Sequence, residues 1–432
     1  MAAADMPRWR WRLAQLLRKL WVRAAFFAAL GGASALAAVG AERFLPFEPP
    51  DLISAEAISS LLDIIASSML AVTTFSLSTM TAAYAAATSN VTPRTTRLLI
   101  EDRISQNVLS TFLGSFLFSI VSLIVLKTGA YGPSGRLVLF AVTVGVVVLL
   151  VGMLVRWIDY LTKLGRVGET TRRVEAVARA AIEARVAEPW LGGVALGAVQ
   201  KAPPAGAHLI RAGAVGYLQH IDMPSLSACA DAAGQEVFIL HNPGAFLAED
   251  DLLAWLPAGV EEGLAREIRA AFSLGDLRNF DQDPRFGLAV LSEIASRALS
   301  PAVNDMGTAI DVIGRGARLM ALWGAGQARA EAPAPCYPRL HVPALCDADL
   351  LEDAFMLIAR DGAGMIEVQL RLQKVLAGLA RLGPAGFRAA AQAQAALAAA
   401  RAEAALPIAA DRARLAAEIE SLGAQASSSA SQ

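Results

Sequence analysis

The chain has 432 residues, of which 55% are hydrophobic and 18% are charged, and its formal net charge is -1. A mean hydropathy of +0.46 is too high for an ordinary soluble protein, and the apolar residues concentrate before residue 162. Binding of nucleic acid requires a clustered excess of Lys and Arg, which the remainder of the sequence lacks, so the composition excludes a nucleic-acid partner. The partner that it predicts is the lipid bilayer.

Four stretches are apolar and long enough to cross a bilayer, which requires roughly twenty residues. They cover residues 24–44, 58–88, 108–126 and 137–160. Arginines interleaved with tryptophans precede the first stretch, as is typical of the cytoplasmic edge of a membrane. A cleaved signal peptide is the alternative for this basic segment, and the spanning length of residues 24–44 argues against it.

The loop between the second and third spans is basic. It carries Arg94, Arg97 and Arg103, and further basic residues follow the fourth span. By the positive-inside rule we expect a multi-pass membrane protein with both termini in the cytoplasm. Topology alone explains the three arginines, and a cytoplasmic gate or a contact with anionic lipid is the functional alternative.

The second span contains a polar seam. At about one hundred degrees per residue, its members fall within a sector of about sixty degrees: Ser60, Asp63, Ser67, Thr74, Ser78 and Thr81. A carboxylate at mid-membrane costs on the order of 2.5 to 3.5 kcal/mol, and Asp63 lies about five residues inside the outer end of the span. Asp63 therefore indicates either an ion or proton pathway or a structural or interfacial pairing, for example with Arg43. Close helix packing is the alternative for the small hydroxyl residues. We expect the seam to face protein or water and not lipid.

After the spans, the character of the sequence changes several times. Charges on a helical period continue the fourth span as a neck until Pro189, after which glycines and prolines indicate a linker. Strand-like runs follow, with a turn at Pro243-Gly244 and a short helix opened by Asp222. The predicted units are residues 1–162 (membrane), 163–206 (helical neck and linker), 207–275 (small β-rich unit), 276–420 (helical region) and 421–432 (disordered tail).

Residues 276–323 predict a helix, a tight turn and a second helix. Asp283 before Pro284 is a typical N-cap, and Asn304 or Asp305 can cap the second helix. The polar groups of this segment form a candidate cytoplasmic site for a ligand or a subunit: Gln282, Asp283, Ser300, Asn304 and Asp305. Capping is the alternative and accounts for most of these groups.

Three parts of the sequence together resemble a known family. They are residues 67–118, which run from the second span through the loop after it into the third span, the pair GYLQHID and NPGAF, and the run QDPRFGLAVLSEIASRALSPAVND. They are similar to the bacterial membrane proteins grouped as "domain of unknown function 2254", from the first span to about residue 380. The resemblance implies a multi-span inner-membrane protein with a cytoplasmic C-terminal region, and it implies no mechanism.

The sequence carries no recognisable catalytic or metal-binding motif. Cys336, His341 and Cys346 do not have the spacing of zinc ligands. A nucleotide-binding loop, a metalloprotease motif and a nucleophile elbow are all missing from it. We therefore expect no enzyme, no metal and no cofactor.

The expected fold is a mainly α membrane protein with four transmembrane helices, a helical neck, a small β-rich cytoplasmic unit and a helical C-terminal region. The first functional hypothesis is an ion channel gated by its cytoplasmic domain. Four spans enclose little space alone, so this hypothesis requires a homo-oligomer around the seam, with Asp63, Ser67, Thr74, Ser78 and Thr81 lining the path. The second hypothesis is a non-conducting scaffold or sensor whose cytoplasmic domain binds a ligand or a protein.

Overall fold

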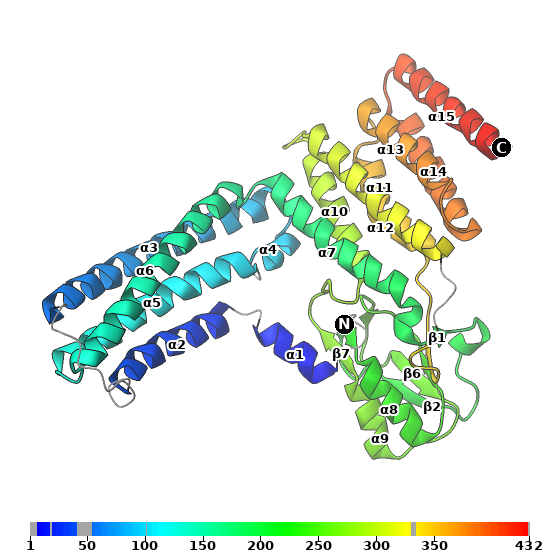
Figure 1. Cartoon of the computed structure of the whole chain (residues 1–432). Coiled ribbons are helices and arrows are strands. Elements are labelled where there is room, and N and C mark those ends of the chain that lie inside the picture. The colour runs from blue at the N-terminus through cyan, green and yellow to red at the C-terminus, as the bar shows by residue number, and fades with distance from the viewer. Residues whose placement is uncertain (1–6, 18–19, 41–53, 101, 330–333, 431–432) are drawn as a thin grey trace. The chain divides into compact units, whose positions relative to one another are not determined.

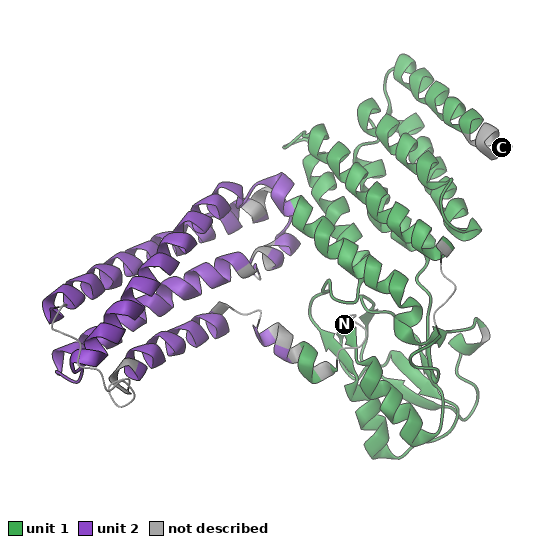
Figure 2. Ribbon diagram, viewed as in Figure 1, with its two compact units in different colours: residues 1–11, 171–432 green, residues 12–170 purple. Residues whose placement is uncertain are grey.

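The structure is a computed structural model. It describes residues 7–17, 20–40, 54–100, 102–329 and 334–430. The chain forms two compact units, which Figure 2 distinguishes by colour. Residues 12–170 are called the membrane unit here, and residues 1–11 together with 171–432 are called the large unit. As expected, the fold is mainly helical.

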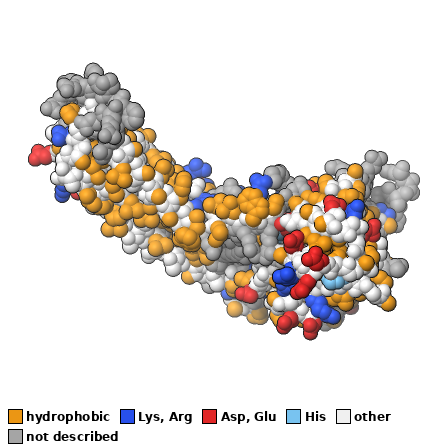
Figure 3. Space-filling model, turned by 90° about the horizontal axis from the view of Figure 1, so that it is seen from below, with side chains coloured by type: hydrophobic (Ala, Val, Ile, Leu, Met, Phe, Trp, Pro, Cys, Tyr) orange, Lys and Arg blue, Asp and Glu red, His pale blue; other side chains and the backbone are white. Residues whose placement is uncertain are grey.

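The described elements of the membrane unit are all helices (Figure 1), because a bilayer leaves no water to satisfy open backbone groups. They are α1 (Arg8–Leu17), which the large unit shares, α2 (Leu20–Gly40), α3 (Ala55–Asn90), α4 (Pro93–Ile100), α5 (Arg103–Lys127) and α6 (Pro133–Lys163). Figure 3 shows hydrophobic side chains spread over this unit, whereas most acidic and basic side chains in that view lie on the large unit.

Three of these helices are long and apolar enough to cross a membrane. The spanning stretches are Ala55–Ala86 in α3, Ile104–Lys127 in α5 and Pro133–Lys163 in α6. The apolar stretch of α2 is shorter, Trp21–Ala37. The end of the expected first span, residues 41–44, and most of the loop after it lie outside the described residues. Three of the four expected spans are therefore present as long apolar helices.

α5 is the central helix of the membrane unit and packs against α2, α3 and α6. Two glycines allow its close approach to α2. A Cβ atom at Gly114 would lie 2.8 Å from the carbonyl oxygen of Phe27, and one at Gly31 would overlap the carbonyl oxygen of Gly114. Small residues at such a crossing let the two backbones touch, which is how helices associate in lipid.

The fourth span does not continue directly into the neck. α6 ends at Lys163 and α7 (Val167–Ala187) begins four residues later. Gly165 between them has a φ of +79°, a left-handed conformation that glycine adopts without steric cost. The expected uninterrupted helix is thus broken, because glycine ends helices readily at this conformation.

The described residues of the large unit form two small sheets. The first has the order β1-β8-β4-β6-β2, with parallel pairs at β1–β8 and β8–β4, and the second is antiparallel with the order β5-β3-β7. The strands are β1 (Val194–Ala195), β2 (His208–Arg211), β3 (Gly216–Ile221), β4 (Val237–Ile239), β5 (Phe246–Leu247), β6 (Leu252–Leu256), β7 (Phe272–Gly275) and β8 (Leu340–Val342). Helices α8 (Met223–Ala233) and α9 (Glu262–Ala270) share one hydrophobic core with these strands.

Local signals in the β-rich part are confirmed. The side chain of Asp222 caps α8 by accepting a hydrogen bond from the Ser225 N–H over 3.0 Å. Gly244 has the positive φ, +100°, that the predicted turn requires. β8 was not predicted, because it lies in the region expected to be helical. It pairs with β1 and β4, which are distant from it in sequence.

The remainder of the large unit is a stack of helices, in which α10 packs against α11 and α12, and α14 against α12 and α13. Their bounds are α10 (Pro284–Ala298), α11 (Met306–Arg329), α12 (Asp347–Asp361), α13 (Ile366–Leu379), α14 (Ala385–Ala405) and α15 (Ala409–Ala430). Two short 3₁₀ helices, η3 (Pro189–Gly192) and η4 (Val199–Lys201), follow α7. α15 extends to Ala430, into the segment expected to be disordered.

Candidate functional site

The seam of the second span lies on the outer surface of α3. All of its members are exposed in the single chain: Ser60, Asp63, Ser67, Thr74, Ser78 and Thr81. The side chains with which α3 packs into the bundle include Leu62, Ile65, Met69 and Met80. At about one hundred degrees per residue, the two sets are about 150 degrees apart around the helix. The seam therefore points away from α5 and α6.

Four of the seam hydroxyls, those of Ser60, Ser67, Thr74 and Thr81, are hydrogen-bonded within α3. Ser67 donates to the carbonyl oxygen of Asp63 over 2.8 Å, Thr74 to that of Leu70 over 2.9 Å, and Thr81 to that of Leu77 over 2.8 Å. Each hydroxyl thereby commits its only proton to the backbone and keeps lone pairs as acceptors. With the carboxylate of Asp63, the seam presents a row of oxygen acceptors to its surroundings.

An open groove of about 520 Å³ lies over the C-terminal half of the seam. Its lining residues are Thr74, Leu77, Ser78, Thr81, Ala82 and Ala85. Large apolar side chains flank the seam, among them Ile64 and Phe75, which are 63% and 67% exposed. The face thus combines a narrow polar strip with a shallow groove and an apolar border.

A second set of polar residues in the membrane unit was missed by sequence reasoning. α5 buries several serines and a threonine, and within the described residues the hydroxyls of Ser110 and Ser119 have no hydrogen-bond partner. Thr111, Ser115, Ser119 and Ser122 recur every three or four residues and fall within a sector of about eighty degrees, so a helical period could have revealed them. Their burial follows from the central place of α5.

The three basic residues expected at a cytoplasmic gate lie near one another in the chain but not in one element. Arg94 is exposed in α4, and Arg97 belongs to the same helix. Arg103 opens α5, where Asp102 caps the helix by accepting from the backbone N–H groups of Ile104 and Ser105. The side chains of Arg97 and Arg103 lie outside the described part of the structure.

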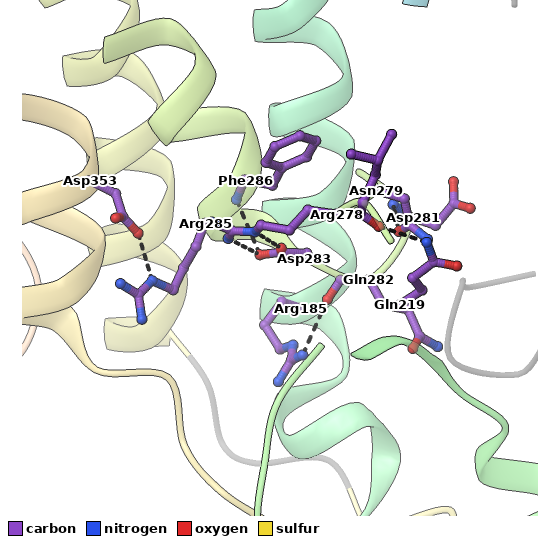
Figure 4. Close-up of polar contacts among 11 residues, drawn as sticks. Arg185, Gln219, Arg278, Asn279, Asp281, Gln282, Asp283, Arg285, Phe286 and Asp353 are labelled. Atoms are coloured by element: carbon purple, nitrogen blue, oxygen red, sulfur yellow. Dashed lines mark hydrogen bonds and ion pairs between the residues drawn. The ribbon is translucent and has the colours of Figure 1, made fainter. Parts of the chain in front are cut away.

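In the large unit, Gln282 and Asp283 are buried beside Arg185 of α7, at the start of α10 (Figure 4). The amide of Gln282 pairs with the backbone of Ile221 in β3: its Oε1 accepts from the N–H over 2.9 Å, and its Nε2 donates to the carbonyl over 3.2 Å. Asp283 caps α10 at the Phe286 N–H over 3.1 Å, which confirms its predicted role. Arg278 donates two hydrogen bonds to its carboxylate, over 2.7 and 3.0 Å.

Arg185 of α7 completes this arrangement. It donates to Asn242 Oδ1 over 3.0 Å and, more weakly, to the Gln282 carbonyl over 3.5 Å. Burial lowers the pKa of Arg185 to about 10, partly offset by the charge of Asp283, so the guanidinium is protonated at neutral pH. A side chain at Gly244 would overlap the Asp283 carboxylate. The NPGAF turn and the start of the QDPRFG segment therefore meet around Arg185, which sequence reasoning did not single out.

The other residues of the candidate cytoplasmic motif lie at the far end of α10. This helix has fifteen residues, which at 1.5 Å per residue is about 22 Å. Asp305 caps α11 by accepting from the Thr308 N–H over 3.0 Å, and its hydrogen bonds with Thr308 lower its pKa. Ser300 and Asn304 belong to the turn before α11. There the carbonyl oxygen of Ser300 accepts a hydrogen bond from the backbone N–H of Asn304 over 2.8 Å. The structure does not bring this end together with Gln282 and Asp283.

Comparisons with known proteins give a family but no activity. A family model described as "Predicted membrane protein (DUF2254)" matches residues 18–378. Uncharacterized proteins of Mycobacterium bovis and Mycobacterium tuberculosis are 33% identical to this chain over 117 residues, which is 26% of the chain and 22% of each relative. The chain thus matches about a fifth of the length of these curated relatives. No solved structure matches it.

Proposed function

The chain belongs to the predicted membrane protein family DUF2254, and from that premise we propose that it assembles into a homo-oligomer that conducts small cations along α3. The outward direction of the seam is the observation that carries this proposal. In a single chain it would turn Asp63, the ninth residue of α3, and the hydroxyls after it toward lipid, where polar groups are costly. Symmetric copies that turn their α3 helices toward a common axis would place the carboxylates in water.

The chemistry of the seam supports cations over anions. The protons of Ser67, Thr74 and Thr81 are donated to α3 itself, so these hydroxyls offer oxygen lone pairs to a passing ion. Asp63 adds a negative charge to the same strip. Rings of acidic side chains and oxygen ligands favour cations, as in other cation pores.

We propose α2 as the fourth span. Trp11 belongs to the large unit, where its Nε1 donates to Asp281 Oδ2 over 2.9 Å and its ring stacks on His220 with centroids 4.9 Å apart. The chain before and after the membrane unit must then lie on one side of the bilayer, which requires an even number of crossings. α3, α5 and α6 supply three, and α2 has 21 residues, or about 31 Å of helix. The basic residues near these ends favour the cytoplasm of a bacterial inner membrane.

A non-conducting scaffold or sensor is the second candidate. It is favoured by the large unit, whose folded core and separate helical stack exceed what a membrane anchor needs. In that case the α3 faces of neighbouring copies pack directly, since small and hydroxyl residues suit close helix contacts. The two candidates differ in whether water reaches the seam.

The test is cation flux through the full chain reconstituted in liposomes, after proof of insertion and folding. Conduction along α3 predicts potassium uptake by the native protein and its loss in Thr74→Ile, which places an apolar branch on the seam. Phe75→Ile is the matched control, because residue 75 is exposed on the same helix but off the seam. Asp63→Asn is expected to weaken the preference for potassium over chloride.

If the native protein is folded and inserted but passes no ion under voltage, pH or osmotic stress, the conduction proposal is wrong. The scaffold or sensor is then the remaining candidate. Loss of flux in Phe75→Ile with normal flux in Thr74→Ile would place the path elsewhere.

A further inference from the structure

A cavity of about 270 Å³ lies in the large unit beside the C-terminal end of α7. Segments distant in sequence form it: the end of α7, the turn of η3, the C-terminal part of α11, and the start of α12 with the residues before it. Small molecules bind in concave, mostly apolar sites with a few polar groups that orient them. This cavity has that composition, and its size suits a small metabolite.

One polar group of the cavity is the buried cation Arg185. Within the described part of the chain, its hydrogen bonds go to two neutral acceptors, Asn242 Oδ1 and the Gln282 carbonyl, and the nearby carboxylate of Asp283 accepts none from it. A guanidinium carries five N–H donors, so the two bonds leave donors for a further acceptor. A buried charge is stabilised best by an ion of opposite sign, and a carboxylate fits the guanidinium fork with two parallel hydrogen bonds.

A second polar group of the cavity has the opposite charge. Asp347 accepts hydrogen bonds from Trp323 Nε1 over 2.8 Å and from Gln327 Nε2 over 2.7 Å. Both bonds go to Oδ1, and within the described residues Oδ2 accepts none. The Asp347 carboxylate is thereby held in place with one oxygen open to a cationic donor.

The walls between these two charges are apolar and aromatic. Trp323 is buried, and Trp190 lies in the η3 turn with a φ of 55° and a ψ of 29°. Leu191 beside it also has a positive φ, 56°, so two consecutive residues without glycine adopt the left-handed conformation. Such strain persists only where surrounding contacts enforce it, and it concentrates at binding sites. Here it accompanies a Trp190 that lines the cavity.

We propose that this cavity binds a small zwitterion of the α-amino acid class with an apolar side chain. The carboxylate of the ligand pairs with Arg185, its ammonium group pairs with Asp347, and its side chain contacts Trp190 and Trp323. A simple anion would meet the repulsion of Asp347, and a simple cation that of Arg185, whereas a zwitterion complements both charges. The inference is independent of conduction by α3.

The experiment is calorimetric titration of the full chain in detergent with L-phenylalanine and L-leucine. Two analogues isolate the charges: N-acetyl-L-phenylalanine lacks the ammonium group, and L-phenylalaninamide lacks the carboxylate. We expect saturable binding of at least one of the two amino acids. If L-phenylalanine binds, each of its analogues should bind more weakly by about tenfold or more. Absence of saturable binding by both amino acids, or analogues that bind equally well, would overturn the proposal.

Two matched variants locate the site without disturbing Arg185. Ala344 lines the cavity at an exposed position, and Ala348 is exposed outside it, at the start of α12. Ala344→Phe is expected to abolish binding by filling the cavity, and Ala348→Phe to leave it unchanged. Normal binding by Ala344→Phe, with its fold verified by an unchanged melting temperature, would contradict the assignment.

Discussion

The indole Nε1 of Trp11 donates a hydrogen bond to Asp281 Oδ2 over 2.9 Å, across a separation of 270 residues. This contact joins the chain that precedes the membrane unit to the chain that follows it, within one compact unit. The contact therefore constrains the membrane topology of the chain as well as its packing. The proposal of four membrane crossings rests on it.

Reporter fusions at the two termini test this topology. We expect a fluorescent reporter to be active, and a periplasmic phosphatase inactive, at both ends of the chain, because an even number of crossings returns the chain to the cytoplasm. Trp11→Phe keeps an aromatic side chain of smaller size but removes the hydrogen bond, and should lower the melting temperature of the large unit by an amount corresponding to about 1 kcal/mol or more. Termini on opposite sides would exclude α2 as a span.

The close contact of α2 and α5 at their glycines predicts a large difference in stability between two Gly→Leu variants. Gly114→Leu must displace Phe27 of α2 and should destabilise the membrane unit by about 1–3 kcal/mol or more. Gly145→Leu lies within α6 where an added Cβ meets no atom within 4 Å, and should have little effect. Thermal unfolding of both proteins in detergent measures the difference. Equal losses would mean that α2 does not pack on α5 as described.

Gln282 is expected to be the most sensitive uncharged polar residue of the motif around Arg185. Gln282→Leu leaves the buried backbone N–H and carbonyl of Ile221 without partners, at about 1–3 kcal/mol for each group. Gln392→Leu changes an exposed glutamine of α14 and serves as the control. Melting temperatures of the two variants check the prediction. An unchanged melting temperature for Gln282→Leu would show that β3 does not depend on this amide.

Glu175 gives a prediction with a defined pH dependence. Burial alone would raise its pKa, but hydrogen bonds and charges from Arg318 and Arg315, at 2.8 and 2.6 Å, lower the pKa overall. A folded-state pKa below the unfolded value means that the stabilisation is present above the unfolded pKa, about 4.3, and is lost as the pH falls through the folded pKa. Glu175→Gln should therefore lower the melting temperature strongly at pH 7 and much less at about pH 3.

The control for this prediction is Glu183→Gln on the same helix. Glu183 is exposed and pairs with Arg179 over 3.6 Å, and such surface pairs contribute little, about 0–1 kcal/mol. A loss at pH 7 that is as large for Glu183→Gln, or a Glu175→Gln effect that does not shrink in acid, would show that the ion pairs do not stabilise the neck.

Local sequence signals predicted local structure well. Asp222 and Asp283 cap helices, and Gly244 supplies the positive φ of its turn, because each of these effects depends only on a few neighbouring residues. The seam of α3 was also visible, since a helical period fixes which side chains share a face. Its outward direction was not, because that depends on which face of α3 packs against α5.

Features that depend on contacts between distant segments could not be predicted from the sequence. β8 is three residues long and gains its place between β1 and β4 only when the chain folds back. In the sequence, nothing distinguishes Arg185 from the other charged residues of the predicted neck helix. Its contacts with Asn242 and Gln282 form only in the folded chain. Residues predicted as one motif, such as Asp283 and Asp305, are separated by the length of α10.

Accessibility of the α3 seam to a charged thiol reagent tests the central proposal most directly. Starting from a chain whose Cys229, Cys336 and Cys346 are replaced, single cysteines are introduced as Ser67→Cys, Thr74→Cys and Ser78→Cys, with Phe75→Cys as the matched control off the seam. In intact membranes, a water-lined cation path predicts that a membrane-impermeant cationic reagent modifies the three seam positions and spares residue 75. Seam cysteines that are as unreactive as the control, in a folded and inserted protein, would show a dry face and contradict conduction along α3.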